Sequence, residues 1–302
     1  MESPLAPRRT TGWTIWRYSW KDSVPLAITG IQLFGNFWLA ATWEQRSLLE
    51  IFLLWPIFLG LFWYNPIIST HNFLHTPFFR WNSWNSLYRA INSINLGLPQ
   101  ILYRYHHLNH HRHNNDPVDL SGQTQDNSST FAYGREGKHE SVIPYSALGL
   151  FRPSTTQAYL EAQKKGQLPQ FFFELLMSLS GLSIMTWLSW QFFLFFYVPT
   201  FYFGWFLAHM ENYYEHYGAN PHSRYADSIS FYGSFYNFLF CNEGYHQEHH
   251  LRPQVHWVKR PAILVEFNEQ LNESSRFVSK VPPILGFLER RPNRPCSPES
   301  EN

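Results

Sequence analysis

Four long stretches of this sequence carry almost no charged side chains. They cover residues 24–43, 48–69, 168–188 and 190–208, and their only charged residues are Glu50 and Glu174. A helix of about 20 apolar residues is long enough to cross the hydrocarbon core of a bilayer. We therefore predict four transmembrane helices. Four buried helices of a soluble α protein are the alternative, but apolar runs of this length are read as spans first.

The connections between these stretches predict their pairing. The sequence TWEQRS joins the first two, and Ser189 alone separates the last two. Joins this short allow only tight turns, so the spans form two hairpins. The N-terminus, residues 70–167 and residues 209–302 then share one side of the membrane. Because the two turns offer only Arg46 while the middle segment is rich in lysine and arginine, the positive-inside rule predicts that this side is cytoplasmic.

These expectations divide the chain into three parts. Residues 1–22 form an N-terminal cytoplasmic segment without the apolar core of a signal peptide. Residues 23–262 form an all-α membrane domain with a cytoplasmic helical cap. Residues 263–302 form a C-terminal cytoplasmic helix and a disordered tail. Within the middle part, residues 81–102 have helical periodicity, as a helix on the membrane surface or in the core of the cap, and residues 121–140 are a loop.

Composition excludes several classes of protein. The formal net charge of +1 makes a nucleic-acid binder improbable. The two cysteines, Cys241 and Cys296, exclude a disulfide scaffold and a cysteine-rich metal site, and we interpret Cys241 as a buried filler. Charged residues make up 15% of the chain and aromatic residues 19%, which suits lipid and its interfaces better than water.

Histidines are gathered in three short motifs. His71 and His75 stand in HNFLH, His107, His110 and His111 in HLNHH, and His246, His249 and His250 in HQEHH. On a helix, residues three or four apart share one face, so their imidazoles reach one point. Adjacent histidines diverge by about 100° on a helix, which makes them poor ligands for one metal but good ligands for two neighbouring metals. The motifs therefore predict a two-metal site.

The spacing leaves two ligand positions open. His106, in YHHLNHH, competes with His107. His216, in NYYEHYG, and His209, seven residues earlier, are further candidates. Without a thiolate cluster, imidazole ligands suit zinc, copper, iron and nickel. Because hydrocarbon C–H bonds do not hydrolyse, a site facing a bilayer favours iron with O2 over hydrolytic zinc.

The same motifs resemble those of a known family. HNFLH, HLNHHRHNNDP and GYHQEHH are similar to the three histidine boxes of membrane fatty-acid desaturases and their hydroxylase relatives, over residues 64–261. NYYEHYG resembles the segment that gives membrane alkane hydroxylases a ninth histidine. The resemblance implies four membrane helices with a cytoplasmic cap, two iron ions, O2 and nine ligands: His71, His75, His107, His110, His111, His216, His246, His249 and His250.

The resemblance also implies partners. Because the chain has no HPGG haem-binding string, its electrons must come from a separate ferredoxin-like or cytochrome donor. The leading hypothesis is an oxidoreductase that desaturates a fatty-acyl or related lipid chain. Hydroxylation of such a chain on the same centre is the alternative. A zinc-dependent lipid hydrolase and a metal transporter are remote alternatives, the latter because a transporter needs polar ligands inside its spans. The carrier of the substrate and the oligomeric state are open.

Some polar residues remain for secondary roles. Asp116, Asp119, Glu215 and Glu248 stand beside ligand positions, where carboxylates often orient metal-bound imidazoles. A solvated surface charge is the alternative for each of the four. We interpret His113 as a neighbour of the site or as solvent-facing. The histidines interpreted as ordinary polar residues are His139, His222 and His256. No sequence pattern supports a head-group site at Arg80, Arg89 or Arg104.

Overall fold

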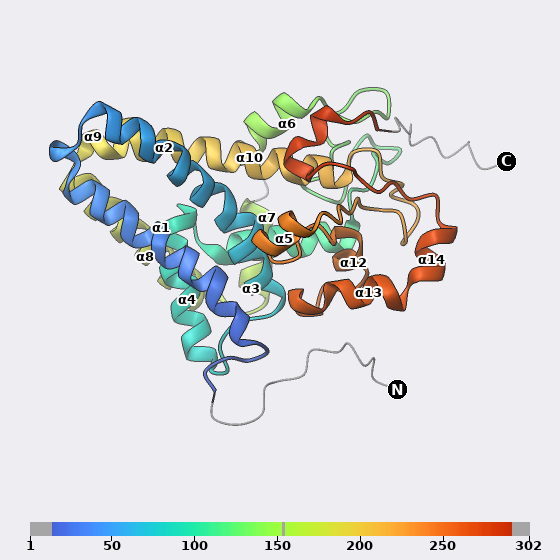
Figure 1. The fold of residues 1–302 in the computed structure, drawn as a ribbon, viewed down its shortest axis with the longest axis horizontal. Coiled ribbons are helices and arrows are strands. Elements are labelled where there is room, and N and C mark those ends of the chain that lie inside the picture. Colours follow the sequence, from blue (N-terminus) through green and yellow to red (C-terminus); the bar gives the residue numbers. More distant parts are fainter. Residues whose placement is uncertain (1–13, 153–154, 292–302) are drawn as a thin grey trace. The chain divides into compact units, whose positions relative to one another are not determined.

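The computed structural model describes residues 14–152 and 155–291. Throughout these residues every regular element is helical (Figure 1). The chain divides into two compact units, each described separately. Among the described residues, the span unit comprises residues 14–105 and 155–208, and the histidine unit comprises residues 106–152 and 209–291. The predicted disordered tail beyond residue 291 and most of the N-terminal segment lie outside the described residues.

Four helical stretches are long and apolar enough to cross a membrane, as the sequence predicts. They are Trp20–Ala41, Leu48–His75, Leu168–Leu188 and Trp190–His216. Their α-helical parts are α1 (Ser23–Ala41), α2 (Leu48–Tyr64), α3 (His71–His75), α8 (Leu168–Leu188), α9 (Trp190–Phe192) and α10 (Val198–His216). π-helical segments join α2 to α3 over Asn65–Thr70 and α9 to α10 over Phe193–Tyr197.

The two hairpin turns lie at the same end of the span unit (Figure 1). Trp43, in the 3-10 turn after α1, packs edge-on against Phe192 of the second hairpin with ring centroids 5.7 Å apart. Ser47 caps α2 and forms a reciprocal capping box with Glu50. The Glu50 carboxylate therefore accepts from the backbone N–H of Ser47 at the start of the second span, which explains a carboxylate at that position.

The helix predicted over residues 81–102 is in fact two helices, α4 (Asn82–Leu96) and α5 (Gln100–His113). The break falls at Gly97, whose φ of 66° favours glycine, and Pro99 follows. Periodicity alone missed this stop signal. Helix α4 packs against α8, where Ile94 lies so close to Gly181 that a larger residue there would clash.

Neutral polar side chains form a buried network inside the span unit. The Asn65 amide donates to Gln32 Oε1 at 2.8 Å and to Asn92 Oδ1 at 2.9 Å. Asn92 in turn donates to Thr70 Oγ1 at 2.8 Å and to Gln100 Oε1 at 3.0 Å. We call these five residues the amide network. It joins α1, α4 and α5 to both ends of the π-helical segment that precedes His71.

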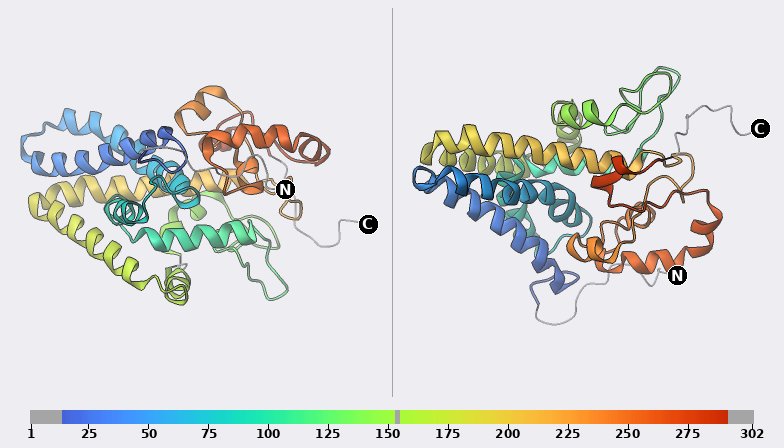
Figure 2. Two further views of the ribbon diagram at one scale, coloured as in Figure 1. Left: turned by 90° about the horizontal axis from the view of Figure 1, so that it is seen from below. Right: turned by 45° about the horizontal axis from the view of Figure 1, so that its top comes forward.

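The histidine unit is built from short helices and long connections. A connection without regular structure follows α5 and leads to α6 (Val142–Leu148), as Figure 2 shows. It includes the predicted loop over residues 121–140. Between α6 and α8 the chain returns to the span unit through α7 (Thr155–Lys164). Beyond α10 the remaining α-helices of the described residues are α11 (Ser234–Leu239), α12 (His246–Leu251), α13 (Arg260–Glu266) and α14 (Asn268–Glu273).

Candidate metal centre

The histidine unit holds α12 and the C-terminal parts of α5 and α10, and these bring seven histidines together. Helix α5 carries the second motif, the end of α10 carries His216, and the short helix α12 carries the third motif. The seven divide into two sets that could each hold a metal ion. The first histidine set is His107, His111 and His249, and the second histidine set is His110, His216, His246 and His250.

Each adjacent pair of histidines is divided between the two sets. His110 belongs to the second set and His111 to the first, while His249 belongs to the first and His250 to the second. The divergence of neighbouring side chains on a helix produces this division. The second and third motifs therefore each contribute to both candidate metal positions, which is the geometry that the two HxxHH strings predict.

The ring nitrogens within each set converge. In the first set, His111 Nε2 lies 3.0 Å from both His107 Nε2 and His249 Nε2. In the second set, His246 Nε2 lies 3.3 Å from His216 Nε2 and 3.1 Å from His250 Nε2. Metal–imidazole bonds of about 2.1 Å place neighbouring ligand atoms roughly 3.0–3.4 Å apart. The observed spacing is thus the spacing that a shared metal ion would impose.

Hydrogen bonds among the imidazoles do not account for this convergence equally well. An imidazole nitrogen carries either one proton or one lone pair. His111 Nε2 and His246 Nε2 each face two other nitrogens, so neither can form two well-directed hydrogen bonds. His110 Nε2 is buried and has no hydrogen-bond partner among the described residues. A cation would satisfy all of these atoms, so the residues present fit a bound metal.

Asp126 orients His110. Its Oδ2 lies 2.8 Å from His110 Nδ1, and both side chains are buried. An ionised carboxylate only accepts, so His110 donates from Nδ1 and its Nε2 keeps the lone pair that a metal needs. Burial acts to raise the pKa of Asp126, but His110 and the hydrogen bonds from His110 and Ser128 outweigh it and hold this pKa below its usual range.

Two other histidines of the second set, His216 and His246, have an acceptor near Nδ1. His216 Nδ1 lies 3.3 Å from the carbonyl oxygen of Asp227. His246 Nδ1 lies 3.3 Å from Glu215 Oε1 and 3.7 Å from Glu243 Oε1. Burial, followed by the neighbouring histidines, lowers the pKa of His250 well below its usual value. The neutral form is the one that binds a metal.

A tight turn after α5 carries Asp126 back to His110. Asn114 and Asn115 have φ values of 51° and 56°, a left-handed conformation that asparagine tolerates better than most residues. The Asn115 backbone then donates to Asp126 Oδ2 at 2.7 Å. Asp116 accepts from the backbone of Asp126 at 2.8 Å. Asp116 therefore positions Asp126 instead of contacting a histidine.

The two residues between the histidines of HQEHH fix α12 in place. Gln247 donates to Asp227 Oδ1 at 2.9 Å. Glu248 accepts from Ser230 at 2.7 Å and from Tyr232 at 2.6 Å. Glu248 is fully buried and anchors the helix, so neither a solvated charge nor an imidazole-orienting carboxylate describes it. Of the four carboxylates singled out in the sequence, Glu215 alone faces a histidine, and Asp119 is exposed and caps its own turn.

The first motif lies in the span unit. His71 and His75 are both buried on α3, with ring centroids 5.2 Å apart. His71 Nδ1 lies 3.1 Å from the carbonyl oxygen of Ile67, so it donates there and keeps its lone pair on Nε2. The pair therefore shares one helical face, as the spacing predicts.

The remaining histidines lie outside both sets. His106 is part of neither, and burial lowers its pKa to about 4. His209 packs beside Gly149 and Tyr145. His139 stacks on Phe131 and lies 2.6 Å from Thr130 Oγ1, while His256 caps the 3-10 turn Trp257–Lys259. His222 is exposed, His113 is half-buried, and Cys241 is buried.

These features define a class: a helical membrane protein with a histidine-rich site that could bind two metal ions. The sequence matches the family model for fatty acid desaturases over residues 9–281. The chain therefore belongs to the fatty acid desaturase family and is a desaturase-like membrane oxidoreductase. Comparisons with curated proteins and with solved structures found no match.

Proposed function

We propose that this protein is an O2-dependent di-iron oxidoreductase that desaturates a fatty-acyl or related lipid chain. The observation that carries the proposal is the division of His110 and His111, and of His249 and His250, between two convergent sets of nitrogens. When bound, iron with O2 supplies the oxidising power to break an unactivated C–H bond. O2 is reduced to two waters by two electrons and two protons from the lipid chain, together with two electrons from a separate ferredoxin-like or cytochrome donor and two protons from solvent.

The proposed ligands are the nine histidines of the three motifs and NYYEHYG. In the histidine unit these are the seven members of the two sets, and His71 and His75 of the first motif complete the proposal on the basis of the family resemblance. Asp126 holds His110 in the tautomer that binds metal. We place the catalytic domain at residues 23–262, with the histidines and both termini on the cytoplasmic side.

Hydroxylation on the same centre is the second candidate. The observation that favours it is His216, which stands in the segment that resembles alkane hydroxylases and lies in the second histidine set. Hydroxylation consumes one O2 and two donor electrons, places one oxygen atom in the product and releases one water. Under ¹⁸O2 a hydroxylated product carries the label, whereas a desaturated product carries none.

The metal content of the detergent-purified protein tests the proposal. We expect about two iron ions per chain. We expect His110→Ala to lose iron and all activity, because it removes a proposed ligand and leaves the buried Asp126 carboxylate without one of its donors. His249→Ala should behave alike. His106→Ala is a matched control, because His106 is also a histidine of α5 but belongs to neither set. About one zinc ion and no iron, or full activity in His110→Ala, would refute the proposal.

A further inference from the structure

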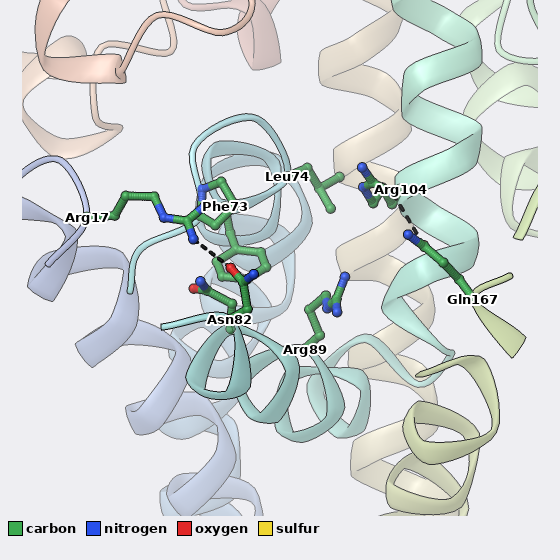
Figure 3. A pocket seen from close by; sticks show the side chains of 9 residues that line it. Arg17, Phe73, Leu74, Asn82, Arg89, Arg104 and Gln167 are labelled. Atoms are coloured by element: carbon green, nitrogen blue, oxygen red, sulfur yellow. Dashed lines mark hydrogen bonds between the residues drawn. The ribbon is translucent and has the colours of Figure 1, made fainter. Parts of the chain in front are cut away.

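Three arginines line one hollow of the span unit. The cavity has a volume of about 400 Å³ and is lined by Arg17, Arg89 and Arg104 together with Phe73, Leu74, Pro77, Asn82, Asn85 and Gln167. Figure 3 shows the three guanidinium groups arriving from three different segments of the chain, with Phe73 and Leu74 between them. We call this hollow the arginine pocket. Its volume lies within the range of small-molecule sites, roughly 300–1,000 Å³.

The arginine pocket has a surplus of positive charge. Arg89 lies 3.6 Å from the buried carboxylate of Glu174. Arg17 and Arg104, by contrast, form no ion pair with any carboxylate among the described residues. Arg17 donates to the neutral Asn82 Oδ1 at 2.7 Å, and Arg104 donates to Gln167 Oε1 at 3.4 Å. One carboxylate against three guanidinium groups leaves a net charge that an anion would balance.

Partial burial adds a cost at Arg89, which is half-buried like Arg17 and Arg104. Burial lowers the pKa of Arg89, Glu174 acts in the opposite direction, and the nearby Arg104 lowers it further. Arg17 Nε is buried and has no hydrogen-bond partner among the described residues. Arg89 Nε is the atom that faces the Glu174 carboxylate, at 3.6 Å. Planar guanidinium groups match phosphate and carboxylate oxygens in pairs of hydrogen bonds. Arg17 Nε is therefore a donor available to an oxyanion.

The position of the pocket along the chain places it at one membrane surface. Arg17 precedes the first span, Leu74 ends the second, and Gln167 precedes the third. These three span ends share one side in a chain that crosses in sequence. Trp81 and Trp84, at the start of α4, are half-exposed, as is typical of aromatic residues at the membrane–water interface. The pocket thus lies where lipid head groups lie.

The apolar wall of the pocket belongs to the first histidine motif. Phe73 and Leu74 lie between His71 and His75 in HNFLH, and both are buried. Phe73 therefore stands two positions from each of two proposed iron ligands. An apolar wall beside a cationic wall suits a charged group attached to a hydrocarbon better than a free inorganic anion.

From this geometry we infer that the arginine pocket binds the anionic head group, phosphate or carboxylate, of the lipid-chain substrate. Identifying the bound lipid as the substrate rests on the proposed function, whereas anion binding in the pocket does not depend on it. A binding measurement needs neither iron turnover nor O2. If the wild-type protein binds the anionic lipid but does not oxidise a lipid chain, the proposed function alone is contradicted. If the protein oxidises a lipid chain but the pocket variants bind the anionic lipid as wild type does, the pocket alone is contradicted.

The test is equilibrium binding of dodecyl phosphate to the full-length protein in dodecyl maltoside, a neutral detergent with the same chain. We expect Arg104→Gln and Arg17→Gln each to weaken binding about tenfold or more, since each removes charge-assisted hydrogen bonds. Lys165→Gln is the matched control, because Lys165 is an exposed cation of the same unit and does not line the pocket. Arg104→Lys keeps the positive charge but not the planar pair of guanidinium donors, so it should weaken binding of dodecyl phosphate less than Arg104→Gln does.

A second probe separates the source of the anion. Inorganic phosphate should bind wild type at least tenfold more weakly than dodecyl phosphate, because it lacks contact with Phe73 and Leu74. Equal affinities would overturn the lipid assignment, and wild-type affinity in both glutamine variants would overturn the pocket. Iron content and elution profile report folding. If Arg104→Gln fails to fold, Arg17→Gln decides the question.

Discussion

Asp126 shows how one side chain outside the histidine motifs sets the chemistry of a residue inside them. Its carboxylate accepts from His110 Nδ1, from the Asn115 backbone and, through Oδ1, from the backbone and hydroxyl of Ser128. These donors hold the carboxylate ionised and fixed. A fixed acceptor behind an imidazole raises its basicity and selects the tautomer that presents Nε2.

We therefore expect Asp126→Asn to weaken iron binding about 10- to 100-fold, the usual effect of losing a partner behind a ligand. The asparagine keeps the shape but removes the charge. Competition with a chelator at neutral pH measures the change. Asp119→Asn is the control, because Asp119 is an exposed carboxylate on the same loop. Unchanged iron affinity in a folded Asp126→Asn protein would mean that Asp126 does not strengthen iron binding through His110.

Among the elements, the π-helical segment Asn65–Thr70 connects a membrane span to the first histidine motif. A π-helical turn holds one more residue than an α-helical turn, and such turns recur at functional sites. Here both ends of the segment are hydrogen-bonded: Thr70 donates to Asn65 Oδ1 at 2.8 Å, and Asn92 bonds to both residues. The amide network therefore fixes the register of the segment immediately before His71.

Replacing Asn92 should destabilise the fold. Asn92→Leu removes a hydrogen-bond partner from each of Asn65, Thr70 and Gln100, which are all buried. The free energy of unfolding should fall by about 1–3 kcal/mol. The loss is measured as a lower midpoint of thermal unfolding in detergent. Asn272→Leu makes the same change on the exposed surface of α14 and should have little effect. Equal midpoints for both variants would show that the network adds no stability.

The elements that sequence predicts well are those with a local signal. The four spans follow from apolar length, and the histidine motifs from helical spacing. The break at Gly97 had a signal in Gly97 and Pro99, but the periodicity of residues 81–102 runs across it. Asp126 lies 16 positions beyond His110 in a polar loop. The sequence around Asp126 and the pair Asn114–Asn115 indicate turns. They do not reveal that Asp126 contacts His110. The arginine pocket combines residues from distant segments, which no local pattern reveals.

At the scale of the whole molecule, four spans and two tight turns determine which segments share a side of the membrane. Trp20–Ala41, Leu48–His75, Leu168–Leu188 and Trp190–His216 are each long and apolar enough to cross a membrane, and we propose that the chain crosses once in each. An even number of crossings returns a chain to its starting side. This proposal puts the two turns on the side opposite to the histidines and the termini.

Cysteine labelling in sealed vesicles tests this topology. In a Cys296→Ser background, Gln45→Cys in the first turn and Glu136→Cys in the α5–α6 connection should react with an impermeant reagent from opposite sides, because one crossing separates them. Both positions are exposed and Cys241 is buried. The unmodified background protein controls for Cys241. Labelling of both positions from the same side would contradict the two-hairpin arrangement.

The amide network also has a consequence for how the protein is made. An amide in hydrocarbon is unfavourable until it finds a partner. Gln32 lies in the first span and Asn65 in the second, and they bond to each other at 2.8 Å. Both belong to the first hairpin, so each meets its partner as soon as the ribosome has delivered two spans. The first hairpin can therefore enter the bilayer as a pair, before Asn92 or any part of the third motif has been synthesised.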